Sequence, residues 1–173
     1  MKKVLAMVLA LAMVLCCTAA LAEGAETFVG LGVKTGIGSS ADASADGDGK
    51  AQVDSAIAVV CVDKDGVIQY AIIDSAQTKI SFSIEGKITA DTAAEIKTKS
   101  EKGAEYGMKS ASAIGLEWNE QIAGLEAWLV GKTVDDLKTA YEGKDETLLA
   151  VCSIHLDDTI AALEKAVANA LAK

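Results

Sequence analysis

The hydrophobic pattern divides this chain into a strand-rich first half and a helical second half. Residues 52–62, QVDSAIAVVCV, are apolar at almost every position from Ala56 onward, a pattern typical of a strand that is covered on both faces. An Asp-Gly turn follows at residues 63–66, and a second β-rich run occupies residues 67–74. Two such runs separated by an Asp-Gly turn predict a β-hairpin.

Two further segments extend the predicted sheet. Residues 26–38 mix apolar residues with four glycines and predict an irregular first strand and turn. Residues 79–84 alternate cleanly, so we expect a separate strand there with Ile80, Phe82 and Ile84 facing inward. Together these segments predict a meander of three or four antiparallel strands.

Helices are expected in the second half. Their predicted spans are residues 93–102, 116–130, 133–137, and from Asp157 or Asp158 to Leu171. Thr92 with Glu95 has the spacing of a capping box, and so does Thr133 with Asp136. One apolar stripe in the second helix consists of Trp118, Ile122, Leu125 and Leu129. Because the strands precede the helices, the predicted fold class is α+β, an antiparallel β-meander packed against C-terminal helices.

The first residues predict export. Lys2 and Lys3 precede an apolar run, Val4–Leu15, which has the length of a signal-peptide core and falls short of the roughly 20 residues of a membrane-spanning helix. Ala20-Leu21-Ala22 supplies a small-x-small cleavage pattern. We therefore expect a signal peptide at residues 1–22 and a single domain at residues 23–173.

Two extracytoplasmic destinations remain open. The chain is either secreted or associated with the cell envelope. Attachment to the membrane would require a lipoprotein in which Cys16 or Cys17 is acylated.

Charge narrows the range of partners. The formal net charge is −9, and all 16 basic residues are lysines. Removing residues 1–22 takes away Lys2 and Lys3 and no acidic residue, which moves the charge to −11. A domain without arginine lacks the bidentate fork that phosphates favour, so no nucleic-acid partner is expected.

No metal site and no catalytic group is predicted. Asp46 and Asp48 alternate, but position twelve of a calcium loop counted from Asp46 is Ile57. Cys61 and Cys152 could form one disulfide or remain two buried thiols, and both alternatives stay open. The single histidine, His155, lies in VCSIHLDD, where no spacing aims a nucleophile at its ring, so we expect a surface histidine and a non-enzymatic protein.

The best candidate for a binding site is the loop that precedes the predicted helix at residues 116–130. Glycine and serine beside aromatic residues can stack a planar ligand and offer it backbone amides. The predicted cofactor-binding residues are Tyr106, Met108, Lys109, Ser112, Gly115 and Trp118. The alternative is that Tyr106, Met108, Trp118 and Trp128 belong to the core.

Three segments resemble the outline of FMN-binding domain proteins. They are GVKTGIG at residues 32–38, the strand pair at residues 50–74, and DDTIAALEKAVANALAK at residues 157–173. The resemblance implies an exported module of flavin-based extracytoplasmic electron transfer. Members with covalent FMN attach it to a threonine just before the final helix. The matching position here is near Ile154, which cannot accept FMN, so the resemblance implies non-covalent FMN or no flavin.

The expected function is therefore an exported, non-enzymatic binding domain that resembles FMN-binding modules and holds a flavin or another small planar ligand. The alternative is a structural or interaction protein of the cell envelope, which has an envelope protein as its partner and no cofactor.

Overall fold

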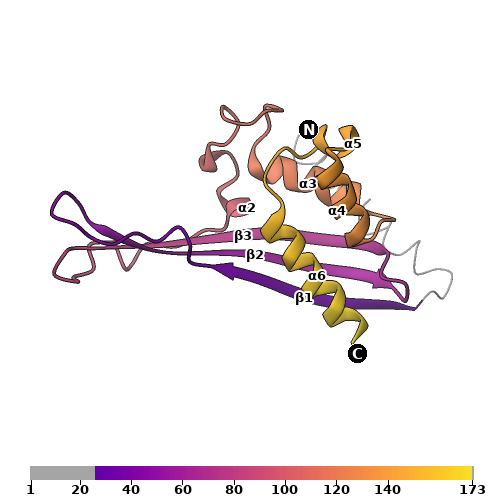
Figure 1. The fold of residues 1–173 in the computed structure, drawn as a ribbon, viewed down its shortest axis with the longest axis horizontal. Helices are drawn as coiled ribbons and strands as arrows, with labels where there is room; N and C mark the ends of the chain where they lie inside the picture. The colour runs from indigo at the N-terminus through magenta and orange to yellow at the C-terminus, as the bar shows by residue number, and fades with distance from the viewer. Residues whose placement is uncertain (1–25, 173) are drawn as a thin grey trace, which may run out of the picture.

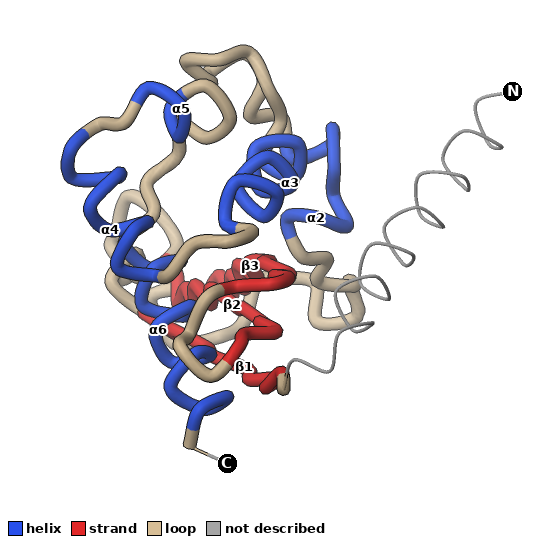
Figure 2. The backbone as a smooth tube through the Cα atoms, turned by 90° about the vertical axis from the view of Figure 1, so that its right-hand side faces the viewer, coloured by secondary structure: helices blue, strands red, loops and turns tan. Residues whose placement is uncertain are grey.

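The computed structural model of the protein describes residues 26–172, so the expected signal peptide lies outside the described residues. A three-stranded antiparallel sheet has the order β1-β2-β3. The helices lie on one side of this sheet (Figures 1 and 2). The strands are β1 (Thr27–Gly36), β2 (Gly49–Asp63) and β3 (Ile68–Phe82). The helical elements are α2 (Lys99–Lys102), the 3-10 helix η2 (Gly103–Tyr106), α3 (Trp118–Leu129), α4 (Val134–Gly143), α5 (Glu146–Leu149) and α6 (Asp157–Leu171).

This arrangement confirms the α+β class, an antiparallel β-meander packed against C-terminal helices. The hairpin predicted at residues 63–66 is also confirmed. Oδ1 of Asp63 accepts hydrogen bonds from the amides of Asp65 and Val67, at 2.9 and 3.0 Å. Gly66 has a φ of 79°, a left-handed conformation that glycine adopts without a steric penalty.

The prediction of a separate strand at residues 79–84 is wrong. Residues 79–82 continue β3, which pairs with β2 from Ile68 to Phe82, and Ser83 and Ile84 lie beyond the end of the strand. No glycine, proline or asparagine lies between Asp74 and Lys79 to turn the chain, so the strand runs on. The expected inward orientation is wrong as well, because Ile80 is 40% exposed, Ile84 is 62% exposed and Phe82 is only partly buried.

The helix predicted at residues 93–102 is much shorter in the structure. It begins at Lys99, where Thr98 and Glu101 form the capping box expected of Thr92 and Glu95. Residues 91–96 are exposed and packed against no core, and a short helix without packing does not repay its nucleation cost. Only the last turn of the predicted helix forms.

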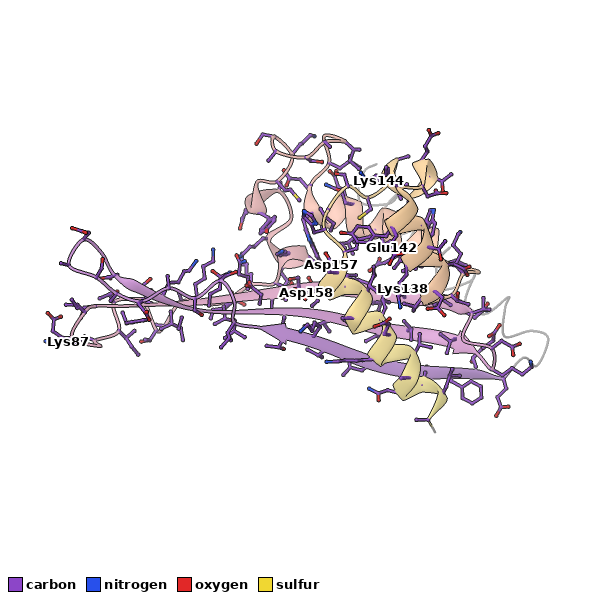
Figure 3. The ribbon with its side chains drawn as sticks, in the orientation of Figure 1. Lys87, Lys138, Glu142, Lys144, Asp157 and Asp158 are labelled. Carbon is purple, nitrogen blue, oxygen red and sulfur yellow. The ribbon has the colours of Figure 1, made fainter. Side chains whose placement is uncertain are left out.

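The remaining helices follow the predicted pattern. The stripe of Trp118, Ile122, Leu125 and Leu129 in α3 is at most 4% exposed. Thr133 and Asp136 form a capping box at the start of α4, which continues beyond the predicted end to Gly143. Lys138 of α4, labelled in Figure 3, donates a hydrogen bond of 2.9 Å to Glu164 of α6. Within residues 26–172 no helix combines the length and apolarity that crossing a bilayer needs.

The tightest packing in the fold is between α6 and β1. A Cβ atom placed on Gly30 would fall on the carbonyl oxygen of Ala166, and one placed on Gly32 would fall on that of Ala162. Both glycines are buried, as are the facing alanines of α6: Ala162, Ala166 and Ala170. Gly30 and Gly32 therefore form the surface of β1 on which α6 packs, and we call this contact the seat of α6.

Both edges of the sheet are partly occupied by side chains of the same chain. On β1, the carbonyl oxygens of Leu31 and Val33 accept hydrogen bonds from Asn169 and Lys165 of α6, each at 2.8 Å. On β3, the Ile73 amide donates to Oε1 of Glu126 at 2.7 Å. The pKa of the Glu126 carboxyl group is raised, mainly because the group is partly buried and also because Asp74 lies nearby. The hydrogen bond from the Ile73 amide lowers this pKa but does not cancel the increase.

The ends of β2 and β3 extend beyond the helices as an arm, whose tip carries Lys87 (Figures 1 and 3). On the arm, Asp54 accepts hydrogen bonds of 2.9 Å from the side-chain amides of Gln52 and Gln77. Partial burial alone would raise the pKa of Asp54, but these hydrogen bonds lower it. These polar contacts lie on the same face of the sheet that the helices cover elsewhere. On the arm this face makes polar contacts, whereas under the helices it makes apolar ones.

The seat of α6 yields the first prediction. Replacing Gly30 or Gly32 with alanine should lower the free energy of unfolding by roughly 3 kcal/mol or prevent folding, because helix and strand would have to separate. Urea unfolding measures the change. Gly36→Ala is the matched control in the same strand, where a new Cβ meets no atom within 4 Å, and it should leave stability unchanged or slightly higher. Equal stability of all three variants would contradict this account of the contact.

Candidate functional site

The six residues predicted to bind a cofactor lie in one region, between α2 and the first turn of α3. Tyr106 ends η2, the loop holds Met108, Lys109, Ser112 and Gly115, and Trp118 begins α3. Their environments differ. Trp118 is buried at 4% exposure, Tyr106, Met108 and Ser112 are half-buried, and Lys109 and Gly115 are exposed.

A fully buried glutamine fastens this loop. The side-chain amide of Gln121 donates to Oγ of Ser112 at 3.0 Å and to the carbonyl of Leu116 at 3.1 Å. Its oxygen accepts from the backbone amide and the hydroxyl of Ser153, at 2.8 and 3.1 Å. Gln121 therefore ties the loop to the segment between α5 and α6.

Other contacts complete this fastening. Oε2 of Glu117 accepts a hydrogen bond of 2.8 Å from the Met108 amide. The Met108 sulfur lies 3.9 Å from Nε2 of Gln121. Met108 and Ser112 are thus engaged with the protein itself, which matches the core alternative considered for Met108.

Sequence reasoning missed Gln121 and Lys99. Gln121 lies on the buried side of α3 between Trp118 and Leu125, and a polar residue inside an apolar stripe is the signal that could have revealed it. Lys99 had no such signal, because only the fold brings its Nζ to 5.1 Å from the Tyr106 ring centroid and 5.4 Å from that of Trp118.

The segment around His155 does not assemble a nucleophile with a base. Ser153 bonds to Gln121, while Nδ1 of His155 lies 3.4 Å from the Tyr141 hydroxyl. That hydroxyl also donates to Asp157 at 3.3 Å. Cys152 is buried, and burial raises the pKa of its thiol, which keeps it protonated and unreactive.

Cysteine and acidic side chains are the groups that could form a disulfide or hold a metal ion. Cys61 and Cys152 are free thiols in the structure, and of the two thiols expected to be buried only Cys152 is, since Cys61 is partly exposed. Across residues 26–172, no group of three or more histidine, cysteine, aspartate or glutamate side chains is placed to hold a metal ion.

A cleft of about 490 Å³ lies elsewhere, and none of the six predicted residues lines it. It is wide open to solvent. Its walls come from the end of α3, the turn that follows, α4 and the start of the next turn, with Trp128, Lys132 and Asp136 among them. Lys132 Nζ is already 4.3 Å from the Trp128 ring centroid and bonds to the Trp128 carbonyl at 2.8 Å.

Several exposed apolar side chains of the described residues gather on the face of the sheet opposite the helices. Strand pairing places its residues in adjacent rows: Val29 beside Cys61 and Tyr70, Leu31 beside Val59 and Ile72, and Val33 beside Ile57. We call these eight residues the open face. Leu31 is 53% exposed and Ile72 is 49% exposed, although each lies in the middle of its strand.

The open face carries no charged side chain, although 24% of the residues of the chain are charged. Charged residues flank it at both ends in the register: Asp74 pairs with Ile57, and Asp63 pairs with Thr27 beside Cys61. Further along the same face, toward the arm, Val53 and Ile80 add apolar surface. Sequence reasoning found the two-sided apolar pattern of β2 but did not identify one side as exposed.

Comparisons with known proteins find no matching family model, no matching curated protein and no matching solved structure.

Gln121 yields the second prediction. Gln121→Leu should lower the free energy of unfolding by about 2 kcal/mol, because it leaves the partly buried Ser153 amide without its acceptor. The Ser153 amide should also exchange its hydrogen faster, and thermal unfolding with hydrogen exchange measures both effects. Lys109→Ala, in the exposed part of the same loop, is the control and should change neither. An unaltered exchange rate in Gln121→Leu would contradict the fastening role.

Proposed function

We propose that this chain is an exported interaction protein of the cell envelope that binds another protein through the open face of its sheet. The observation that supports this function best is the open face itself, which groups eight apolar or weakly polar side chains on three adjacent strands. The function needs no catalytic residue and no cofactor.

The extent of the open face favours protein binding. Its apolar surface is on the order of 500 Å², near the upper end of the largest patch on a typical monomer, and such patches are often functional. An antiparallel sheet that leaves one face in water normally presents polar side chains there. Here the opposite is found: on β1, the residues on the uncovered face are Val29, Leu31 and Val33, and all three are exposed.

The occupied edge groups favour docking on the face over strand addition. A partner that adds a strand needs free amides and carbonyls along an edge. Lys165 and Asn169 occupy two carbonyls of β1, those of Val33 and Leu31, and Glu126 occupies the Ile73 amide of β3. The partner would therefore bury side chains, and its affinity would depend on apolar contact.

The third prediction tests this function. Residues 23–173, which contain every described element, are immobilised and exposed to envelope extract. The double variant Leu31→Lys and Ile72→Lys should capture at least about tenfold less partner than the wild type, because both lysines would have to be desolvated in the interface.

The matched control is Val130→Lys with Leu149→Lys, which places the same charges at exposed apolar positions outside the sheet. It should capture as much as the wild type. Circular dichroism and thermal unfolding check that all variants are folded. We call Leu31→Lys with Ile72→Lys the face variant. The proposed function is wrong if the face variant captures partners as well as the control variant does and also self-associates as well as the control variant does.

Flavin binding is a second candidate function, favoured by one observation. Lys99 lies within cation–π distance of both Tyr106 and Trp118, beside the glycine- and serine-containing loop. A flavin with a phosphate could use Lys99 as its ionic partner and Tyr106 as a stacking surface. This candidate would make the chain a non-covalent FMN module, as the family resemblance implies.

The fourth prediction is that FMN added to residues 23–173 shifts its visible spectrum and loses fluorescence, and that Lys99→Ala weakens this binding roughly tenfold. Lys87→Ala, at the tip of the arm, is the control and should bind as the wild type does (Figure 3). Absence of a spectral change together with absence of a thermal shift would rule out the flavin candidate.

A further inference from the structure

We infer that the partner of the open face is a second copy of this chain, so that two sheets pack face to face in a symmetric dimer. This inference rests on the proposed function and specifies its partner. The two sheets together would form a sandwich with helices on both outer sides. Val59 lies at the centre of the open face, between Leu31 and Ile72, and marks the expected position of the two-fold axis.

The first argument is electrostatic. The chain has a formal net charge of −9, so two copies repel each other across most of their surfaces. A symmetric interface brings the same patch of both copies together, and any net charge on that patch would oppose itself. The open face has no charged side chain and is therefore compatible with its own copy.

The second argument is area. A stable interface needs about 1,000 Å² of total buried surface or more. Two copies of the open face supply approximately this area, on the order of 500 Å² from each copy, before the polar rim is counted. The exposed Val53 and Ile80 lie on the same side of the sheet and can extend the contact toward the arm.

The third argument is the pattern of β2. Its residues from Ala56 to Val62 are apolar on both sides, as in a strand covered on both faces. The helices cover Ala58, Val60 and Val62, which are fully buried. A second sheet of the same kind, stacked at about 10 Å, is the standard cover for the other side.

The fifth prediction is that residues 23–173 sediment as a dimer. Leu31→Lys with Ile72→Lys should weaken dimerisation by at least about a hundredfold, whereas the control Val130→Lys with Leu149→Lys should not weaken it. Added sodium chloride should strengthen the wild-type dimer, because it screens the repulsion between two acidic chains.

Cys61 provides a native probe of the interface. It lies on the open face, two residues from Val59, while Cys152 is buried in the core. Alkylation of Cys61 should slow as the protein concentration rises, and this protection should vanish in the face variant. Cys152 is the internal control and should react slowly in all samples until the protein unfolds.

The possible outcomes separate this inference from the proposed function. A monomer that still captures an envelope protein through the open face would overturn the dimer and retain the function. A monomer without face-dependent capture would overturn both. A dimer that the face variant does not weaken, or a monomer that binds neutral lipid vesicles through the face, would also overturn the dimer proposed here.

Discussion

The close contact between α6 and β1 is the constraint on which the rest of the structure depends. Gly30 and Gly32 give the helix room to rest on strand backbone, and Ala162 and Ala166 keep the helix surface flat enough to reach it. Dispersion contacts at such short range are sensitive to each added methyl group. Once α6 occupies this seat, its Lys165 and Asn169 reach the outer carbonyls of β1. One contact therefore sets the helix position, the buried face and the closure of one edge.

The same arrangement explains why the opposite face is left uncovered. The helices cover one side of the three-stranded sheet, and side chains of α3 and α6 bond to groups on its two edges, among them Glu126 with the Ile73 amide. No described element covers the other side. Occupied groups on an edge hinder the addition of further strands, whereas an apolar face can still associate. The fold thus permits a limited, face-directed association and discourages edge-to-edge aggregation.

Sequence reasoning succeeded where one local signal determined the structure. The Asp-Gly hairpin, the α3 stripe and the Thr133 cap each depend on residues a few positions apart. It failed where distant residues decide. Residues 79–82 continue β3 because β2 is long enough to pair with them, and α2 is short because no core lies beneath residues 91–96. The role of Gly30 depends on Ala166, and the open face is visible only when the helices are seen to lie on one side. The candidate loop was located correctly as one region, but its attachment to Ser153 through Gln121 joins segments that no sequence pattern connects.

The seat of α6 also affects how the chain folds. β1 begins at Thr27 and α6 ends at Leu171, so this contact joins the first and the last elements of the described fold. Contacts between such distant residues form late, because the chain must lose the entropy of a long loop before the contact adds any stability. A nascent chain has no α6 to place on Gly30 and Gly32 until residues 157–171 have been synthesised. Until then the helix-facing side of β1 and much of that of β2 stay uncovered, and the chain remains incompletely folded.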